Sequence, residues 1–210
     1  MEKHFSEIDL SVDAKDAFGA DYFRISGEPR RKPATKWVRW AEKDASGHYK
    51  PVVFRLTGEL FRVYKHRQAG TGLYCTRYTL VFDGDGWHRQ DTGEVCQACA
   101  DGNDPALIGL GTIIVRSDDG DYAAPAAFTP SHLYGLRELA ANPKWGNPLF
   151  YDIRSILPTG GQKGYTLIPE PPIRPLTDQE RAMAADLDFN PQRAWNAMLE
   201  KQKANNPGNP

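Results

Sequence analysis

Residues 74–89 read YCTRYTLVFDGDGWHR, and this stretch organises our interpretation of the whole chain. Asp-Gly pairs favour tight reversals between antiparallel strands, so residues 83–86 predict the turn of a β-hairpin. Along residues 74–82 the Tyr and Phe rings recur at every fourth position, which puts them on one side of a strand. The stretch therefore predicts a hairpin with one aromatic face and one mixed face.

The hairpin also predicts that distant cysteines meet. Counting back from the centre of the turn, Cys75 lies opposite Glu94, one or two residues from Cys96. The segment Cys96-Gln97-Ala98-Cys99 holds two thiols two residues apart, a spacing that points at one tetrahedral metal ion. Cys75 would then supply a third thiol.

A histidine completes the predicted ligand set. Residues 68–72 are expected to form the loop of an earlier hairpin, which puts His66 roughly opposite Tyr74 and beside Cys75. His88 is the alternative fourth ligand, although the later hairpin places it far up the ladder from the cysteines. The expected zinc ligands are His66, Cys75, Cys96 and Cys99.

A metal with four protein ligands would be structural, because catalytic zinc normally keeps an open position for water. The competing interpretation is three reduced cysteines buried as small apolar side chains, without a metal. The sequence contains no phosphate-binding glycine loop of the P-loop type and no Gly-x-Ser-x-Gly motif. We therefore expect a protein that is not an enzyme.

The near-zero net charge of −1 hides a strong asymmetry. Residues 24–67 carry twelve Lys and Arg against four acidic residues, interleaved with aromatic rings, whereas residues 83–121 carry nine acidic residues against two arginines. A basic, aromatic block is what a nucleic-acid surface requires. The alternative is a solvated basic face with core aromatics beneath it.

Two groups of side chains are candidates for contact with nucleic acid. The candidates for binding phosphates are Arg39, Arg55, Arg62, Lys65, Arg67 and Arg77. The candidates for stacking on bases are Trp37, Trp40, Tyr64, Tyr74 and Tyr78.

Three regions are predicted along the chain. Residues 1–35 are expected to be a flexible basic N-terminal arm, and residues 170–210 a Pro-rich linker, a helical tail and a disordered C-terminus. Residues 36–169 are predicted to be mainly β, an OB-like small β-barrel with one inserted helix that starts at Thr129. The expected strands are 36–40, 52–56, 59–66, 72–82, 111–115, 149–156 and 164–168.

Targeting signals are absent by sequence. The first ten residues are charged and lack the apolar run of a signal peptide, and no stretch approaches membrane-spanning length. An odd number of cysteines argues against a disulfide framework. These features predict a cytoplasmic protein.

A basic, aromatic β-barrel with His66, Cys75, Cys96 and Cys99 in this order resembles the zinc-containing single-stranded DNA-binding, helix-destabilising proteins of T4-type bacteriophages. Residues 70–78 also look like the Gly-rich, Thr-Arg-Tyr-bearing strands of phage single-strand binders. The resemblance implies a role in DNA replication or recombination in the host cell cytoplasm. It also implies cooperative self-association and contacts with replication or recombination proteins through the C-terminal tail.

The sequence departs from that family in two places. The spacing between Cys75 and Cys96 is longer, and residues 178–203 form a mixed-charge helical tail in place of an acidic one. The second hypothesis is a zinc-stabilised protein-interaction module that binds a host factor and no nucleic acid. A nuclease would need a carboxylate cluster around Mg²⁺, which the sequence does not suggest.

Overall fold

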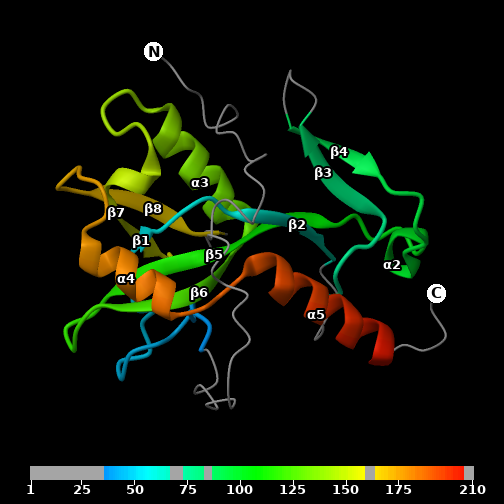
Figure 1. Ribbon diagram of the computed structural model, residues 1–210, viewed down its shortest axis with the longest axis horizontal. Helices are drawn as coiled ribbons and strands as arrows, with labels where there is room; N and C mark the ends of the chain where they lie inside the picture. Colours follow the sequence, from blue (N-terminus) through cyan, green and yellow to red (C-terminus); the bar gives the residue numbers. More distant parts are fainter. Residues whose placement is uncertain (1–35, 67–72, 83–86, 159–163, 206–210) are drawn as a thin grey trace, which may run out of the picture.

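An antiparallel sheet of six strands organises the chain in the computed structural model, which describes residues 36–66, 73–82, 87–158 and 164–205. The predicted N-terminal arm, residues 1–35, lies outside the described residues. A separate two-stranded hairpin stands beside this sheet, and helices α3 (Pro130–Ala141) and α4 (Asp178–Asp186) pack against the six-stranded sheet (Figure 1). The predicted mainly β fold is confirmed.

Strand β5 (Ala106–Arg116) is the centre of the sheet and an almost continuous apolar run, as expected of a strand buried on both faces. Along one edge it pairs with β6 (Tyr122–Phe128). Along the other it pairs first with β2 (Phe61–Lys65) and then with β1 (Val52–Leu56). β1 and β2 therefore run past β5 as one interrupted strand.

The interruption places residues 57–60 opposite only two residues of β5. The Thr57 amide still donates to the Thr112 carbonyl at 3.3 Å, and the Leu60 side chain folds over β5. A Cβ atom at Gly111 would lie 2.6 Å from Leu60 Cδ2, so a glycine is needed where the leucine crosses the strand.

The far side of the sheet is built by two more strands. β7 (Asp152–Ile156) pairs with β1, and β8 (Thr166–Glu170) pairs with β7, so the strand order is β6-β5-β1-β7-β8 with β2 continuing β1. A short 3-10 helix, Pro148–Phe150, precedes β7.

Helix α3 (Pro130–Ala141) closes the core against β5, β6 and β8. Thr129 caps it as predicted, but the reciprocal partner in the capping box is the His132 ring rather than a Glu or Gln side chain. Phe54 and Phe128 are fully buried beneath it, and Trp40 packs on both rings.

The predicted strand at residues 36–40 does not form, and β6 was not predicted. β6 reads YAAPAAF, and both Ala and Pro disfavour strands in general. It nevertheless pairs with β5, and residues 38–40 cover its other edge. The Val38 amide donates to the Pro125 carbonyl at 3.0 Å, and Trp40 Nε1 donates to the Ala127 carbonyl at 2.7 Å.

The chain between β2 and β5 forms a projection made of residues 73–82 and 87–105. We call this projection the arm; it is distinct from the N-terminal arm predicted for residues 1–35. The arm contains the hairpin β3 (Tyr78–Phe82) and β4 (Trp87–Asp91), followed by the single-turn helix α2 (Gln97–Ala100). Figure 1 shows the arm standing to one side of the main sheet.

Two helices end the described chain. The predicted capping box at Thr177 is present and starts α4 (Asp178–Asp186), which packs on β5 and β6. α5 (Pro191–Asn205) then extends to the arm (Figure 1). None of the helices in the described ranges is both long and apolar enough to cross a bilayer.

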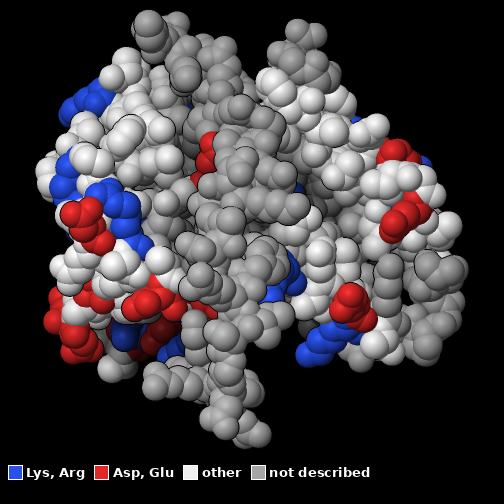
Figure 2. Space-filling model, in the orientation of Figure 1, with Lys and Arg blue, Asp and Glu red and all other residues white. Residues whose placement is uncertain are grey.

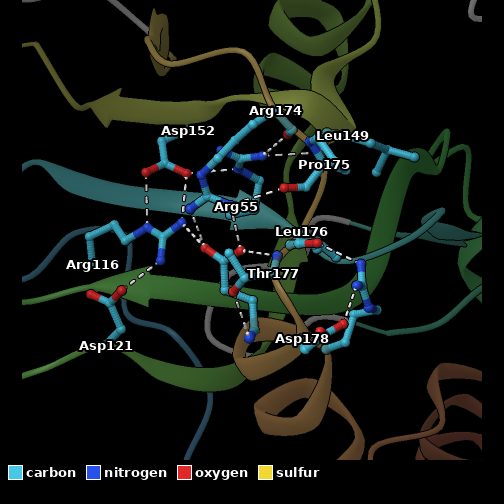
Figure 3. Close-up of polar contacts among 12 residues, drawn as sticks. Arg55, Arg116, Asp121, Leu149, Asp152, Arg174, Pro175, Leu176, Thr177 and Asp178 are labelled. Carbon is cyan, nitrogen blue, oxygen red and sulfur yellow. Dashed lines mark hydrogen bonds and ion pairs between the residues drawn. The ribbon is translucent and has the colours of Figure 1, made fainter.

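An ionic network fastens α4 and the linker before it to the outer face of the sheet (Figure 3). Asp152 accepts hydrogen bonds from Arg55 and Arg116, and Glu180 accepts from Arg116 and Arg174. Hydrogen bonds from Arg174, with a further one from the Thr177 amide, hold the pKa of Glu180 far below its usual range. Figure 2 shows acidic and basic side chains intermingled over this part of the surface, at the lower left.

Candidate metal centre and the adjoining arm surface

Four ligand atoms meet at the base of the arm. One ligand atom each from His66, Cys75, Cys96 and Cys99 all lie within 4.8 Å of one another. His66 and Cys75 are buried, whereas Cys96 and Cys99 are half-buried. The four residues predicted from the sequence are therefore brought together and could hold a metal ion.

The first hairpin positions His66 and Cys75. The His66 amide donates to the Leu73 carbonyl at 2.7 Å, and the Cys75 amide donates to the Tyr64 carbonyl at 2.9 Å. Tyr74 consequently faces Lys65, one residue from the predicted register, in which it faced His66. His66 and Cys75 still lie at the same end of the two paired segments.

The second hairpin brings Cys96 back to Cys75. Its register matches the prediction, because Val81 pairs with His88 and Tyr78 pairs with Asp91. The pairing continues below the strands, where the Thr92 amide donates to the Arg77 carbonyl at 2.8 Å. His88 therefore lies well up the ladder from Cys96, and the structure groups His66, not His88, with the cysteines.

Helix α2 sets the spacing of the last two ligands. Cys96 is its N-cap, and the Ala100 amide donates to the Cys96 carbonyl at 3.1 Å. One helical turn places residues three apart on the same side. The Cys96 and Cys99 sulfurs therefore both face the His66 ring.

The spacing between the ligand atoms suits a tetrahedral ion. The Cys75 and Cys99 sulfurs are 3.6 Å apart, and His66 Nε2 lies 3.3 Å from Cys96 Sγ and 3.5 Å from Cys99 Sγ. Zn–S bonds of about 2.3 Å at tetrahedral angles separate two sulfurs by about 3.8 Å. The donors therefore need little movement to surround zinc.

The His66 ring is set to bind through Nε2. Burial lowers the pKa of His66, while the backbone of Asn103 and the charge of Asp104 act against that shift. The lowered pKa favours the neutral imidazole, which is the form that binds metals. Nδ1 is buried and has no hydrogen-bond partner among the described residues, whereas the second nitrogen of a metal-bound histidine usually donates to a backbone or carboxylate oxygen.

The three thiols differ in their surroundings. Burial raises the pKa of Cys75, and burial together with the neighbouring sulfurs raises the pKa of Cys99 to about 12. Burial would also raise the pKa of Cys96, but hydrogen bonds from the backbone of Cys99 and Thr76 outweigh it and lower the pKa. A divalent cation among the three sulfurs would favour all three thiolates, because a coordinating thiol is deprotonated.

Three nucleic-acid candidates lie in the interior, which corrects the sequence-based expectation. Arg55 is 0% exposed and is held under the linker by Asp152 and the Arg174 carbonyl. Trp40 is 9% exposed and Tyr64 is 8% exposed, both among other aromatic rings. In residues 24–67, these two aromatic rings therefore belong to the core, and this arginine belongs to an internal ion pair.

The other candidates are more accessible. Arg39 is exposed, and Trp37 is half-buried with its ring edge-on to Phe189 at 5.3 Å. Arg67 lies outside the described residues. The remaining candidates are all half-buried and lie on β2 or in the arm: Arg62, Lys65, Tyr74, Arg77 and Tyr78.

Cations and rings pair repeatedly beside the metal centre. The guanidinium groups of Arg77 and Arg89 lie 5.2 Å and 4.4 Å from the centre of the Tyr78 ring. Arg62 lies 5.8 Å from the Trp87 ring, and Lys65 lies 5.1 Å from the Tyr74 ring. These distances are those of cation–π contacts.

Phe82, Trp87 and Arg89 were missed as candidate site residues. Phe82 pairs with Trp87 across the hairpin with ring centroids 5.3 Å apart, and Phe82 is 46% exposed. The predicted register already placed Phe82 opposite Trp87, so the signal was present in the sequence. We call the following set the arm surface: Arg62, Arg77, Tyr78, Phe82, Trp87 and Arg89. Lys65 and Tyr74 face each other on the opposite side of β2 from Arg62, and Tyr74 packs against Trp195 of α5.

Three comparisons with known proteins were made, against family models, curated proteins and solved structures, and this chain has no match in any of them.

Proposed function

We propose that this chain is a non-enzymatic, zinc-stabilised protein that binds single-stranded DNA through the arm surface. The proposal is carried by the presence, in the same arm, of a four-ligand metal centre and of two arginines paired with the Tyr78 ring. Proteins that bind single strands combine such charges, which neutralise phosphates, with rings on which bases stack.

The strand order supports an OB-like architecture. With β1 and β2 counted as one strand, three strands run as a meander through β5 and β6, α3 follows, and the hairpin β7–β8 returns to the first strand. We propose that this is a partly open OB-like barrel with its opening between β6 and β8. OB folds bind oligonucleotides with their second and third strands and the loops that flank them.

The arm occupies one of those loops, because it is inserted between the first strand and the second. The outer faces of β5 and β6 are packed against α4. The arm surface is therefore the part of the proposed site that is best placed to meet a strand. Zinc would act by fixing the two hairpin bases and would not touch DNA.

Titration of labelled oligo(dT) tests the proposal. We expect binding that is tighter for single strands than for duplex and that weakens steadily as salt rises. Trp87→Ala and Phe82→Ala should each cost a stacking contact, about 1–3 kcal/mol or roughly 5- to 150-fold in affinity. The matched control is Tyr134→Ala, an exposed ring on α3 that is 65% exposed.

Metal analysis completes the test. The purified chain should contain one zinc, and Cys96→Ser should lose it and unfold at lower denaturant. No binding to oligo(dT) at low salt would contradict the proposed function, whereas absence of zinc alone would contradict only its metal.

A protein-interaction module remains the second candidate, and one observation favours it. The two guanidinium groups beside Tyr78 are already ion-paired, Arg77 with Asp91 and Arg89 with Asp104, and residues 83–121 are strongly acidic in composition. Such a protein would bind no oligonucleotide and would capture a basic partner, so the same titration separates the two candidates.

A further inference from the structure

Helix α5 contacts the strand that carries one of the metal ligands. The backbone of Tyr74, the residue before Cys75, makes two hydrogen bonds to one side chain of the helix. The Tyr74 amide donates to Gln202 Oε1 at 2.7 Å, and Gln202 Nε2 donates to the Tyr74 carbonyl at 3.1 Å. The carboxamide of Gln202 thus pairs with Tyr74 as a neighbouring strand would.

The geometry of the first hairpin explains why Tyr74 is available. Lys65 and Tyr74 face each other without exchanging hydrogen bonds, since the bonds are made by the residues on either side. The amide and carbonyl of Tyr74 therefore point away from β2, toward the free edge of the strand. An unpaired edge exposes polar backbone groups, and Gln202 satisfies both of them.

The packing around this contact extends along the helix. The Trp195 ring lies edge-on to the Tyr74 ring, with centroids 4.8 Å apart. Trp195, Met198 and Gln202 are half-buried and share one face of α5, whereas Gln192 and Asn196 are exposed. The helix therefore holds the Cys75 strand against β2 from outside, and the metal would hold it from inside.

We propose that α5 is a metal-dependent clasp, whose docking on the arm and metal binding at Cys75 strengthen each other. This inference rests on the metal centre of the proposed function. Coupling of two binding events is reciprocal, so loss of the metal should loosen α5 by the same factor by which loss of the α5 contact weakens the metal. Removal of zinc would then release the C-terminal helix.

Zinc affinity is the first test, measured on the full chain by competition with a chromogenic chelator. Gln202→Ala removes both hydrogen bonds to Tyr74 and should weaken zinc binding roughly three- to tenfold. Gln192→Ala, on the exposed face of the same helix, should leave the affinity unchanged.

Amide exchange is the second test, comparing zinc-loaded and chelator-treated wild-type chain. The Tyr74 amide and the amides of α5 should exchange faster without zinc. The clasp would be overturned, with the metal centre intact, by either of two results. One is equal zinc affinity in the wild type and in Gln202→Ala; the other is an equal loss of zinc affinity in Gln202→Ala and in Gln192→Ala. A wild-type chain that takes up no zinc would overturn the metal centre and the clasp together. DNA binding is scored separately by the oligo(dT) titration.

Discussion

A single buried histidine gives the fold a specific sensitivity to acid. His132 is fully buried, its ring is stacked on Tyr165 at 4.0 Å, and its Nε2 lies 3.1 Å from Ser155 Oγ. Burial lowers the pKa of His132 to about 3. The neutral ring therefore belongs to the native state, while the unfolded chain binds a proton near the ordinary pKa of about 6.5.

The sign of the effect follows from these two values. The contribution of His132 is fully present above about pH 6.5 and is lost as pH falls toward about 3, because the unfolded state takes up the proton first. Between pH 7.5 and pH 5 we expect a loss of about 2 kcal/mol in the free energy of unfolding from this residue. Urea unfolding at both pH values measures it.

The matched comparison removes other acid effects. Between pH 7.5 and pH 5, the free energy of unfolding of His132→Gln should fall by about 2 kcal/mol less than that of the wild type. This difference does not depend on the stability of the variant at pH 7.5. His48→Gln, at an exposed position, should behave as wild type. An unchanged pH dependence in His132→Gln would contradict a neutral native His132.

At the scale of elements, the interrupted strand makes a glycine necessary. Leu60 is 6% exposed and crosses β5 at Gly111, so a methyl group there must displace a packed side chain. Gly111→Ala should lower the free energy of unfolding by about 1–3 kcal/mol, the usual range for overpacking. Gly58→Ala lies in the same interruption with nothing within 4 Å of the added Cβ, and it should be neutral or slightly stabilising. Equal effects of the two changes would contradict the proposed crossing.

Elements whose pairing is fixed by local turn chemistry were predicted well. The Asp-Gly turn gave the register of β3 and β4, and the capping residues Thr129 and Thr177 marked the starts of two helices. His66 and the three cysteines could therefore be grouped from the sequence, because a register converts spacing along the chain into distance in space. The earlier hairpin was one residue out of register, since the sequence of residues 67–72 contains no Asp-Gly or Asn-Gly pair that would specify its turn.

Elements that depend on distant partners were not predictable in the same way. β6 is a strand because β5 pairs with it, in spite of its alanines and Pro125, and residues 36–40 lie against its edge without forming a strand. The burial of Arg55 depends on the linker more than a hundred residues later. Composition alone cannot tell such an arginine from one that meets solvent, because the partners that cover it are far away in sequence.

At the scale of the whole molecule, the ionic network joins β1 to the linker before α4 and to α4 itself. Arg55 donates to Asp152 on β7 and to the carbonyls of Leu149 and Arg174 (Figure 3). Arg55→Ala should lower the free energy of unfolding by about 1–3 kcal/mol, because the carbonyls of Leu149 and Arg174 lose this donor while Asp152 keeps its hydrogen bonds from Arg116.

An exposed pair on the same sheet provides the control for Arg55. Arg154 pairs with Glu170 with its side chain 45% exposed, so Arg154→Ala should cost less than about 1 kcal/mol. Denaturant unfolding of both variants checks the difference. If Arg55→Ala instead kept its stability and lost oligonucleotide binding, Arg55 would belong to the nucleic-acid site that composition first suggested.

The position of the metal centre also bears on how quickly the chain can fold. β2 ends at Lys65 and its partner β5 begins at Ala106, so the two strands must find each other across a long loop. Closing such a loop costs conformational entropy, and sheets with distant pairings are slow to form. An ion that joined His66 to Cys99 early would shorten the search from that whole loop to the few residues between α2 and β5.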